Sequence, residues 1–235
     1  MSSEKSAIDF FKGIFVASPG AIEKKLQHIK AYIFDWDGVF NNAHKSTDSN
    51  SSFSEIDSMG INMLRFAHYL KHTQSAAVAV ITGEHNKVAF HFSKREHFDA
   101  VYYKIKHKET ALLHFCNQHN IKPEEVLFVF DDVLDFSAAK IAGVRIMVSH
   151  PCNPLLIDYA TRNNLVDYLT ANEGSTGAIR ETSELIMHLH KQFDQAISYR
   201  AAYSKEYVPF ITERNEKATT YYTILNNVIT EQTPL

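Results

Sequence analysis

Short hydrophobic runs alternate with helical patterns along most of the chain. Each run is rich in Val, Ile, Phe or Tyr and has the length of a strand that is buried on both faces. This pattern predicts a series of strands in the interior of a sheet. The runs are AYIFD (31–35), AAVAVIT (76–82), DAVYYK (99–104), VLFVFDD (126–132) and VRIMVS (144–149), with a shorter one near VDYLT (166–170).

Segments with a helical spacing of apolar residues separate these runs. A strict alternation of strand and helix requires crossover connections, which are right-handed and make neighbouring strands parallel. We therefore predict an α/β fold with a doubly wound parallel sheet of the Rossmann-like kind. The helical segments are 58–71, 84–96, 108–120 and 135–143, and a further helix is expected from about Ala178.

Three segments depart from this alternation. Residues 1–30 are predicted to form an N-terminal extension of one or two short helices, broken at a Ser-Pro-Gly sequence. Residues 41–56 are polar and serine-rich where a loop is usually short, which indicates an inserted flap over the strand ends. Residues 189–235 are predicted to form a C-terminal helical extension, with a new helix starting near Pro209. The core then spans residues 31–188.

Composition and charge narrow the classes of function. The 235 residues are 45% hydrophobic and 22% charged, as in a globular protein, and the formal net charge is −3. That charge gives no basic field to attract nucleic acid or an anionic membrane. The thirteen histidines follow no tight ligand spacing. Two cysteines without a CxxC pattern indicate a reducing compartment, so we expect a cytoplasmic protein without nucleic-acid or membrane partners.

Residues suited to catalysis gather where the predicted strands end. In a doubly wound sheet the ligand crevice lies beyond the carboxyl ends of the strands. Several of the residues are aspartates. Carboxylates that lie close together repel each other, so a cation or a reacting centre is expected between them. The residues are Asp35 and Asp37 after the first core strand, Thr82 and Gly83 after the second, Lys108 at the start of the helix after the third, and Asp131, Asp132 and Asp135 after the fourth.

The aspartates suggest a phosphoryl-transfer site that uses Mg²⁺. Asp35 ends a rigid strand, so we predict that it is the nucleophile that attacks phosphorus. Asp37 lies two residues further on, points to the same side, and is the predicted general acid and then base. Asp131, on the neighbouring strand, is predicted to complete a Mg²⁺ site with Asp35 and Asp37.

The remaining residues of this set are predicted to bind the phosphoryl group or to support the site. Thr82 and the amide of Gly83 can donate to phosphoryl oxygens, and Lys108 can stabilise negative charge in the transition state. Asp132 is expected to cap a helix or to support the site without binding the metal. Asp135 is expected to orient Lys108 or a metal-bound water.

Each assignment has a structural alternative. An Asp-x-Asp-Gly sequence can be a turn whose aspartates cap the next helix. Thr82 could merely end a strand, and Lys108 could be an exposed lysine in the first turn of a helix. Lys104 and Lys106 are neighbouring candidates for the same role.

The strand-end sequences together resemble the four motifs of the haloacid dehalogenase superfamily, phosphatase branch. The chain is more similar still to its capless sugar-acid phosphatases, typified by 3-deoxy-D-manno-octulosonate 8-phosphate phosphatase, and the resemblance covers roughly residues 31–188. Four separated motifs in order are more specific than any one of them. The further segments that carry the resemblance are DSMGINML (57–64), VYYKIKHK (101–108) and EGSTGAIRETSELI (173–186).

The resemblance implies Mg²⁺ as cofactor, an aspartyl-phosphate intermediate and no large cap domain. It also implies a homo-oligomer, commonly a tetramer, in which the segment inserted after the first strand covers a neighbouring active site. The register of the motifs selects Lys108 over Lys104 and Lys106.

Several positions depart from the sugar-acid phosphatase pattern. Glu84 and Ile56 stand where that family often has arginines, Phe130 replaces a glycine before the fourth motif, and Lys104 replaces another glycine. The predicted catalytic residues are therefore all present, whereas the residues expected to recognise the substrate differ from those of the family. We predict that Glu84 affects substrate specificity.

The sequence thus predicts a Mg²⁺-dependent phosphatase for a small phosphorylated metabolite, a sugar or sugar-acid phosphate. Two alternatives remain open at this point. The chain could be a phosphatase-fold protein kept as a binding module, or it could transfer the phosphoryl group to another sugar in place of water.

Overall fold

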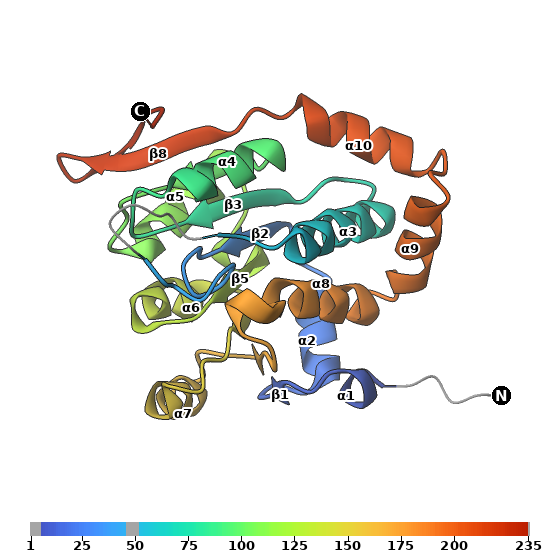
Figure 1. Ribbon diagram of the computed structural model, residues 1–235, viewed down its shortest axis with the longest axis horizontal. Coiled ribbons are helices and arrows are strands. Elements are labelled where there is room, and N and C mark those ends of the chain that lie inside the picture. The colour runs from blue at the N-terminus through green and yellow to red at the C-terminus, as the bar shows by residue number, and fades with distance from the viewer. Residues whose placement is uncertain (1–5, 46–51, 235) are drawn as a thin grey trace.

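A single sheet with helices on both faces forms the centre of the molecule. The computed structural model describes residues 6–45 and 52–234. Within these residues the sheet has nine strands, in the order β1-β7-β6-β5-β2-β3-β4-β8-β9 (Figure 1). The strands from β7 to β8 run parallel to their neighbours, and β1 and β9 pair antiparallel at the two edges. The predicted α/β class with a doubly wound, largely parallel sheet is confirmed.

The predicted core strands are all present. β2 (Ala31–Phe34) lies between β3 (Ala77–Ile81) and β5 (Val126–Phe130), and Ile33 is opposite Ala79 on one side and Phe128 on the other. The strand order reverses between β2 and β5, which places a ligand crevice beyond the carboxyl ends of these strands. The outer parallel strands are β4 (Ala100–Tyr102) beyond β3, and β6 (Val144–Met147) and β7 (Tyr168–Leu169) beyond β5.

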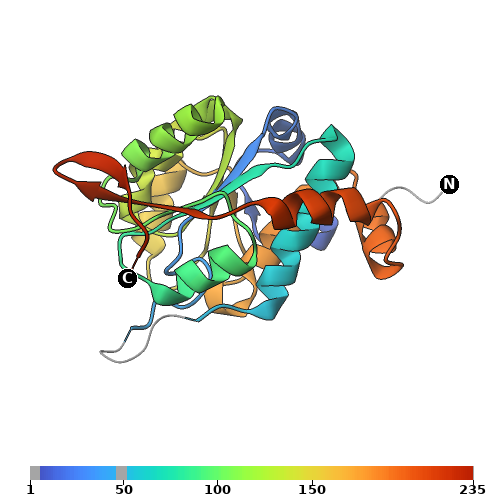
Figure 2. The same ribbon diagram turned by 90° about the horizontal axis from the view of Figure 1, so that it is seen from above.

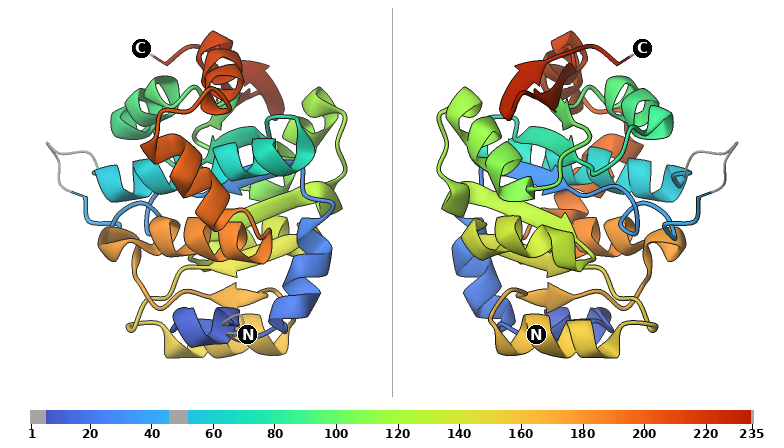
Figure 3. Two further views of the ribbon diagram at one scale, coloured as in Figure 1. Left: turned by 90° about the vertical axis from the view of Figure 1, so that its right-hand side faces the viewer. Right: turned by 90° about the vertical axis from the view of Figure 1, so that its left-hand side faces the viewer.

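Alternate residues of each strand face two separate hydrophobic layers. Tyr32 and Phe34 of β2 pack into one layer, and Ala31 and Ile33 pack into the other. This alternation explains why the strands are apolar along their whole length. The first layer is covered by α2 (Pro19–Leu26), α3 (Glu55–His72), α4 (Lys87–Arg95) and α8 (Ala178–Leu189), and the second by α5 (Lys108–His119), α6 (Phe136–Ile141) and α7 (Pro154–Arg162) (Figure 3).

The N-terminal segment contains a short strand between its helices. α1 (Ala7–Phe10) is followed by β1 (Ile14–Phe15), which pairs with β7 at one edge of the sheet. Ser18 then caps α2, and Pro19 is the first residue of that helix, so the Ser-Pro-Gly sequence marks a helix start. Ile22 is buried in the first hydrophobic layer, so this segment packs on the core.

The C-terminal segment differs from the prediction of helix throughout. α9 (Phe193–Ala201) and α10 (Tyr207–Glu216) are helical, but β8 (Thr220–Leu225) and β9 (Val228–Glu231) form a hairpin. Asn226 and Asn227 both have positive φ, as a two-residue turn between twisted strands requires. β8 extends the sheet beside β4, so the segment runs along the molecule from the helices to the far sheet edge (Figure 2).

The predicted flap at residues 41–56 is described only at its two ends. Residues 46–51 lie outside the described residues. Residues 42–45 and 52–54 contain neither helix nor strand, and Ser54 then caps the first turn of α3. None of the helices in residues 6–45 and 52–234 is long and apolar enough to cross a membrane.

Candidate active site

Backbone pairing in the sheet fixes the residues at the strand ends. The N–H of Asp35 donates to the carbonyl oxygen of Val129 at 2.9 Å, so the β2–β5 ladder continues to the residue after β2. In the same way the N–H of Thr82 donates to the carbonyl oxygen of Tyr102 at 2.8 Å. Asp35 and Thr82 are therefore held as rigidly as the strands that precede them.

Three aspartates meet at this edge of the sheet. Carboxylate oxygens of Asp35, Asp131 and Asp135 lie within 4.8 Å of one another, and all three residues are buried. Lys108 enters from the first turn of α5, and its Nζ lies 2.5 Å from Oδ1 of Asp35 and also pairs with Asp135. The expected role of Asp135 in orienting Lys108 agrees with this contact.

Opposite charge keeps the lysine of this cluster protonated. Burial by itself lowers the pKa of Lys108, but the carboxylates of Asp35 and Asp135 outweigh that effect and raise it. Burial raises the pKa of Asp35, and the negative charges of Asp135 and Asp131 add to the rise while Lys108 opposes it. One lysine thus faces three carboxylates, and a further positive charge would stabilise their ionised forms.

Asp131 has an oxygen that is available to a cation. Its Oδ2 lies 3.0 Å from Nε2 of His150, whereas its Oδ1 is buried and accepts no hydrogen bond. Gly38 leaves room for this carboxylate, because a Cβ at Gly38 would lie 1.9 Å from Oδ2 of Asp131. Gly38 also has φ of +85°, a conformation that favours glycine. A buried, unpartnered carboxylate oxygen beside two other carboxylates fits a hard divalent cation such as Mg²⁺.

The carboxylate of Asp37 lies outside this cluster. Its Oδ2 pairs with Nζ of Lys45 at 2.8 Å, and its Oδ1 lies 3.5 Å from Nδ2 of Asn86. The Asp37 side chain is not among the carboxylates that gather with Asp35, Asp131 and Asp135, and its role as a metal ligand stays a prediction. Its position at the exposed rim suits a group that exchanges protons with substrate or water.

The remaining predicted residues line the same rim. Thr82 is buried, and its Oγ1 accepts a hydrogen bond at 3.3 Å from the N–H of Glu84. Gly83 and Glu84 are exposed. Asp132 is exposed and accepts a hydrogen bond from the N–H of Val133 at 2.7 Å, so it caps the short 3₁₀ turn that precedes α6, as the capping alternative anticipated.

Three contacts of the site were not predicted from the sequence. His150 follows β6 and reaches Asp131, Lys45 comes from the flap, and Asn86 caps the start of α4. His150 could have been found, since it follows the strand next to β5 in the same way as the other residues of the rim. Lys45 and Asn86 lie in loops whose path the hydrophobic pattern does not determine.

Several solved structures are similar to this one. The phosphatase for 3-deoxy-D-manno-octulosonate 8-phosphate from Moraxella catarrhalis, solved with magnesium, phosphate and the sugar acid, aligns at TM-score 0.63 and 26% identity over 75% of this chain and 96% of that one. A subfamily III A hydrolase of the HAD superfamily from Legionella pneumophila aligns at TM-score 0.65 and 25% identity over 78% and 95%. The cobalt-bound Haemophilus influenzae phosphatase aligns at TM-score 0.60 and 26% identity over 71% and 92%.

The fold and the strand-end site are similar to those of these structures, which include a hydrolase of the haloacid dehalogenase superfamily, and they indicate a phosphoric monoester hydrolase. The proteins with similar sequences indicate a narrower class of phosphatase. The chain is similar to 3-deoxy-D-manno-octulosonate 8-phosphate phosphatase KdsC from Haemophilus influenzae, with 27% identity over 71% of this chain and 87% of that one. Identity to the Escherichia coli K12 protein is 27% over 73% and 86%. No protein-family model matches the chain.

Proposed function

We propose that the protein hydrolyses a small phosphorylated sugar or sugar acid with the help of Mg²⁺, through an aspartyl-phosphate intermediate. The observation that carries this proposal is the buried cluster of Asp35, Asp131 and Asp135, bridged by Lys108 and left with one unpartnered carboxylate oxygen. A strand-end carboxylate next to a fixed lysine can serve as a nucleophile, and the unpartnered oxygen can serve as a metal ligand.

Asp35 and Asp37 divide the chemistry between them in this proposal. A carboxylate oxygen of Asp35 attacks phosphorus, and the bond from phosphorus to the sugar oxygen breaks as Asp37 gives that oxygen a proton. Asp37 then takes a proton from water, whose oxygen attacks phosphorus, and the Asp35 carboxylate leaves as phosphate is released. The fixed position of Asp35 and the rim position of Asp37 suit these two roles.

The other residues hold the phosphoryl group. Thr82 and the amide of Gly83 stand at the end of β3 next to Asp35, where they can donate to phosphoryl oxygens. Lys108 stabilises negative charge on Asp35 and on the transferring group. Asp35 and Asp131 would hold Mg²⁺, which would supply positive charge to offset the repulsion between a carboxylate nucleophile and a phosphate dianion.

We infer the substrate class from the names of the relatives and from the residues at two exposed positions. The relatives are named for an acidic sugar phosphate. Glu84 is exposed at the rim, and its charge is opposite to that of the arginine expected there. Ile56 is exposed at the start of α3 and is uncharged where an arginine is also expected. We propose a phosphorylated sugar whose groups near Glu84 are hydroxyls or an amine, in preference to a carboxylate.

The assembly is part of the proposal. Lys45, at the described end of the flap, pairs with Asp37 of its own chain, so the flap begins beside the site. We propose that the flap (41–56) closes the site of a neighbouring subunit in a homo-oligomer, a tetramer as in the family resemblance. Light scattering tests this assembly, because a fully active monomer at micromolar concentration contradicts it.

A hydrolysis screen over phosphorylated metabolites with Mg²⁺ tests the function directly. We expect phosphate release from a subset of sugar phosphates, loss of that release when Mg²⁺ is chelated, and its loss in Asp35→Asn. A chain that binds these esters without turning them over would instead be a binding module. Release of a new phosphorylated sugar in place of phosphate would indicate transfer to another acceptor.

A further inference from the structure

Three histidines from two helices meet at a place remote from the strand ends. His68 and His72 lie one turn apart near the end of α3, and His190 directly follows α8. One ring nitrogen from each lies within 4.8 Å of the others, the reach of a shared metal ion after small side-chain shifts. The rings of His68 and His72 are 4.4 Å apart between centroids, and those of His72 and His190 are 5.7 Å apart.

Three ring nitrogens of this cluster have no hydrogen-bond partner among residues 6–45 and 52–234. His190 is 2% exposed, and neither its Nδ1 nor its Nε2 makes a hydrogen bond. Nε2 of His72 is buried and unpartnered as well. Nδ1 of His68 lies 3.0 Å from the hydroxyl of Tyr32, so Nε2 remains for a ligand. A metal-binding imidazole usually has its other nitrogen held by such a partner, which fixes the ring orientation.

Further buried polar atoms without hydrogen-bond partners lie in the turns that follow α3 and α8. Oγ of Ser75, after α3, and Oε1 of Gln192, after α8, are buried and make no hydrogen bond. Buried polar atoms in folded proteins nearly always have partners, so several orphans in two adjoining turns call for an explanation. Ring packing of three neutral imidazoles explains the contacts among the rings and leaves these nitrogens unsatisfied.

The protonation state suits metal binding. Burial lowers the pKa of His68 and of His190 to about 3, and it also lowers the pKa of His72. A neutral imidazole is the form that donates a lone pair to a metal. One charge works against a cation here, because Lys71 contributes to the lowered pKa of His68 and of His190. Nζ of Lys71 lies 3.4 Å from the carbonyl oxygen of His190.

We propose that His68, His72 and His190 form a binding site for a divalent transition-metal ion, of which Zn²⁺ is the type, joining the end of α3 to the end of α8. Imidazole nitrogens suit Zn²⁺, whereas the carboxylates at the strand ends suit Mg²⁺, so the two sites differ in the ion they prefer. His72 is only partly buried, and the ion enters from its side with water as a further ligand.

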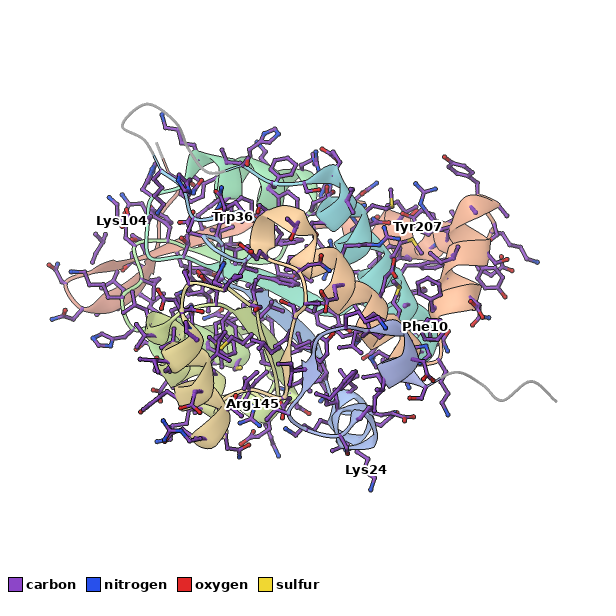
Figure 4. All side chains as sticks on the ribbon, turned by 60° about the horizontal axis from the view of Figure 1, so that its bottom comes forward. Phe10, Lys24, Trp36, Lys104, Arg145 and Tyr207 are labelled. Atoms are coloured by element: carbon purple, nitrogen blue, oxygen red, sulfur yellow. The ribbon has the colours of Figure 1, made fainter. Side chains whose placement is uncertain are left out.

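The two sites lie in different parts of the molecule. Lys104, which follows β4 at the strand-end rim, is at the opposite end of the molecule from Phe10 (Figure 4). Phe10 packs against His188 near the end of α8, two residues before His190. A metal at the histidine cluster therefore stabilises the packing of α3 on α8 and takes no part in phosphoryl transfer.

Calorimetric titration of the full chain with Zn²⁺, in saturating Mg²⁺, tests the site. We expect binding by the wild-type protein that persists in Asp131→Asn, which removes a carboxylate of the other site. His72→Ala, in a partly exposed position near the end of a helix, should weaken Zn²⁺ binding by at least about tenfold, the loss that even a supporting group of a metal site can cause. Lys71→Gln should tighten binding, since it removes the opposing charge.

Matched variants and a second readout make the outcome decisive. His91→Ala removes an exposed histidine of α4 and should bind Zn²⁺ as the wild type does. Zn²⁺ should raise the Tm of the wild type and of Asp131→Asn, and should leave the Tm of His72→Ala unchanged. Zn²⁺ binding that is lost in Asp131→Asn and kept in His72→Ala, or binding weaker than about 1 mM in the wild type, overturns the proposal.

Discussion

At the strand ends, a buried lysine lies between two buried aspartates. Along the α3–α8 interface, Asp57, His68 and His190 are titratable too, but none of them forms an ion pair within residues 6–45 and 52–234. Lys108 and the aspartates beside it are buried, and so are Asp57, His68 and His190. Lys108 has a raised pKa because of its neighbours, while burial raises the pKa of Asp57 to about 6 and lowers those of the two histidines to about 3.

The difference shows what burial does with and without an opposite charge. Burial favours the neutral form of a group unless an opposite charge outweighs it, and at the α3–α8 interface the effect of burial on Asp57 outweighs that of Arg180. A site that must hold a charged nucleophile and a charged lysine has to supply both signs within a few ångströms, as the strand ends do. Substitutions in the two regions should therefore change different quantities: turnover at the strand ends and pH-dependent stability at the helix interface.

The largest expected effect is that of Asp35→Asn. Asparagine keeps the shape of the side chain and removes the attacking charge, so kcat should fall by at least about 10³-fold. Circular dichroism should show an unchanged fold. Asp132→Asn is the matched control, since Asp132 is an exposed aspartate of the same rim that caps a turn, and it should keep most of the activity. Near-parental turnover by Asp35→Asn would rule out the covalent route.

Gly38→Ala should also reduce activity, by displacing a carboxylate without removing it. The added Cβ would meet Oδ2 of Asp131, and the positive φ disfavours any side chain. A displacement of about 1 Å in an active site can reduce turnover by about 10²-fold. We expect that loss together with weaker Mg²⁺ binding in a titration. Gly20→Ala, where a Cβ meets nothing within 4 Å, should leave both unchanged. Equal behaviour of the two variants would show that Gly38 does not position Asp131.

Asp57 tests the helix interface through the pH dependence of stability. Its Oδ1 accepts a hydrogen bond at 2.8 Å from the N–H of Arg180, and burial raises its pKa from 3.8 to about 6. The folded state thus holds a proton that the unfolded state has lost, so the free energy of unfolding should fall as pH rises from about 4 to 6. The wild type should lose up to about 3 kcal/mol over that range.

Chemical denaturation at several pH values measures this effect. Asp57→Asn keeps an acceptor oxygen for Arg180 and should abolish the decline. Glu55→Gln, an exposed carboxylate in the same turn of α3, should retain the wild-type profile. The same decline in Asp57→Asn as in the wild type would assign it to another group.

Glu84 carries the smallest predicted effect. Two negative charges about 4 Å apart repel by roughly 4 kcal/mol at a surface-like dielectric, and Glu84 is exposed, so solvent and ions reduce this considerably. A quarter of that energy gives a several-fold discrimination against an acidic sugar phosphate. Glu84→Arg should shift kcat/KM toward the acid, with Glu84→Gln intermediate. Equal or higher kcat/KM for the acidic sugar on the wild type would leave Glu84 as a charge at the helix start.

The sequence predicted the parts of the fold in which local pattern and tertiary structure agree. The core strands are apolar throughout because both faces are covered, so their positions could be predicted directly. α7 was not predicted, although Pro154 at its start and the apolar residues that follow were usable signals of a helix. The β8–β9 hairpin was missed although its tyrosines, threonines and isoleucines are typical of strands and Asn226-Asn227 was a usable turn signal.

The candidate site was predictable to the extent that it lies at strand ends. Asp35, Asp131 and Lys108 each follow a strand or begin the next helix, so topology alone brings them to one edge. Asp37 lies away from the other carboxylates and pairs with Lys45. This position could not be predicted, because the loop that contains Lys45 has no periodic pattern. The histidine cluster depends on how α3 packs on α8, which spacing along one helix cannot reveal.

The pairing of β8 with β4 sets a time interval during synthesis of the chain. Ala100 pairs with Thr220, which is made 120 residues later. At roughly 5–20 residues per second, the edge of β4 waits about 6 to 24 s for its partner. During that interval an unpaired parallel strand is open to other chains, so nascent protein is most exposed to aggregation before Thr220 emerges.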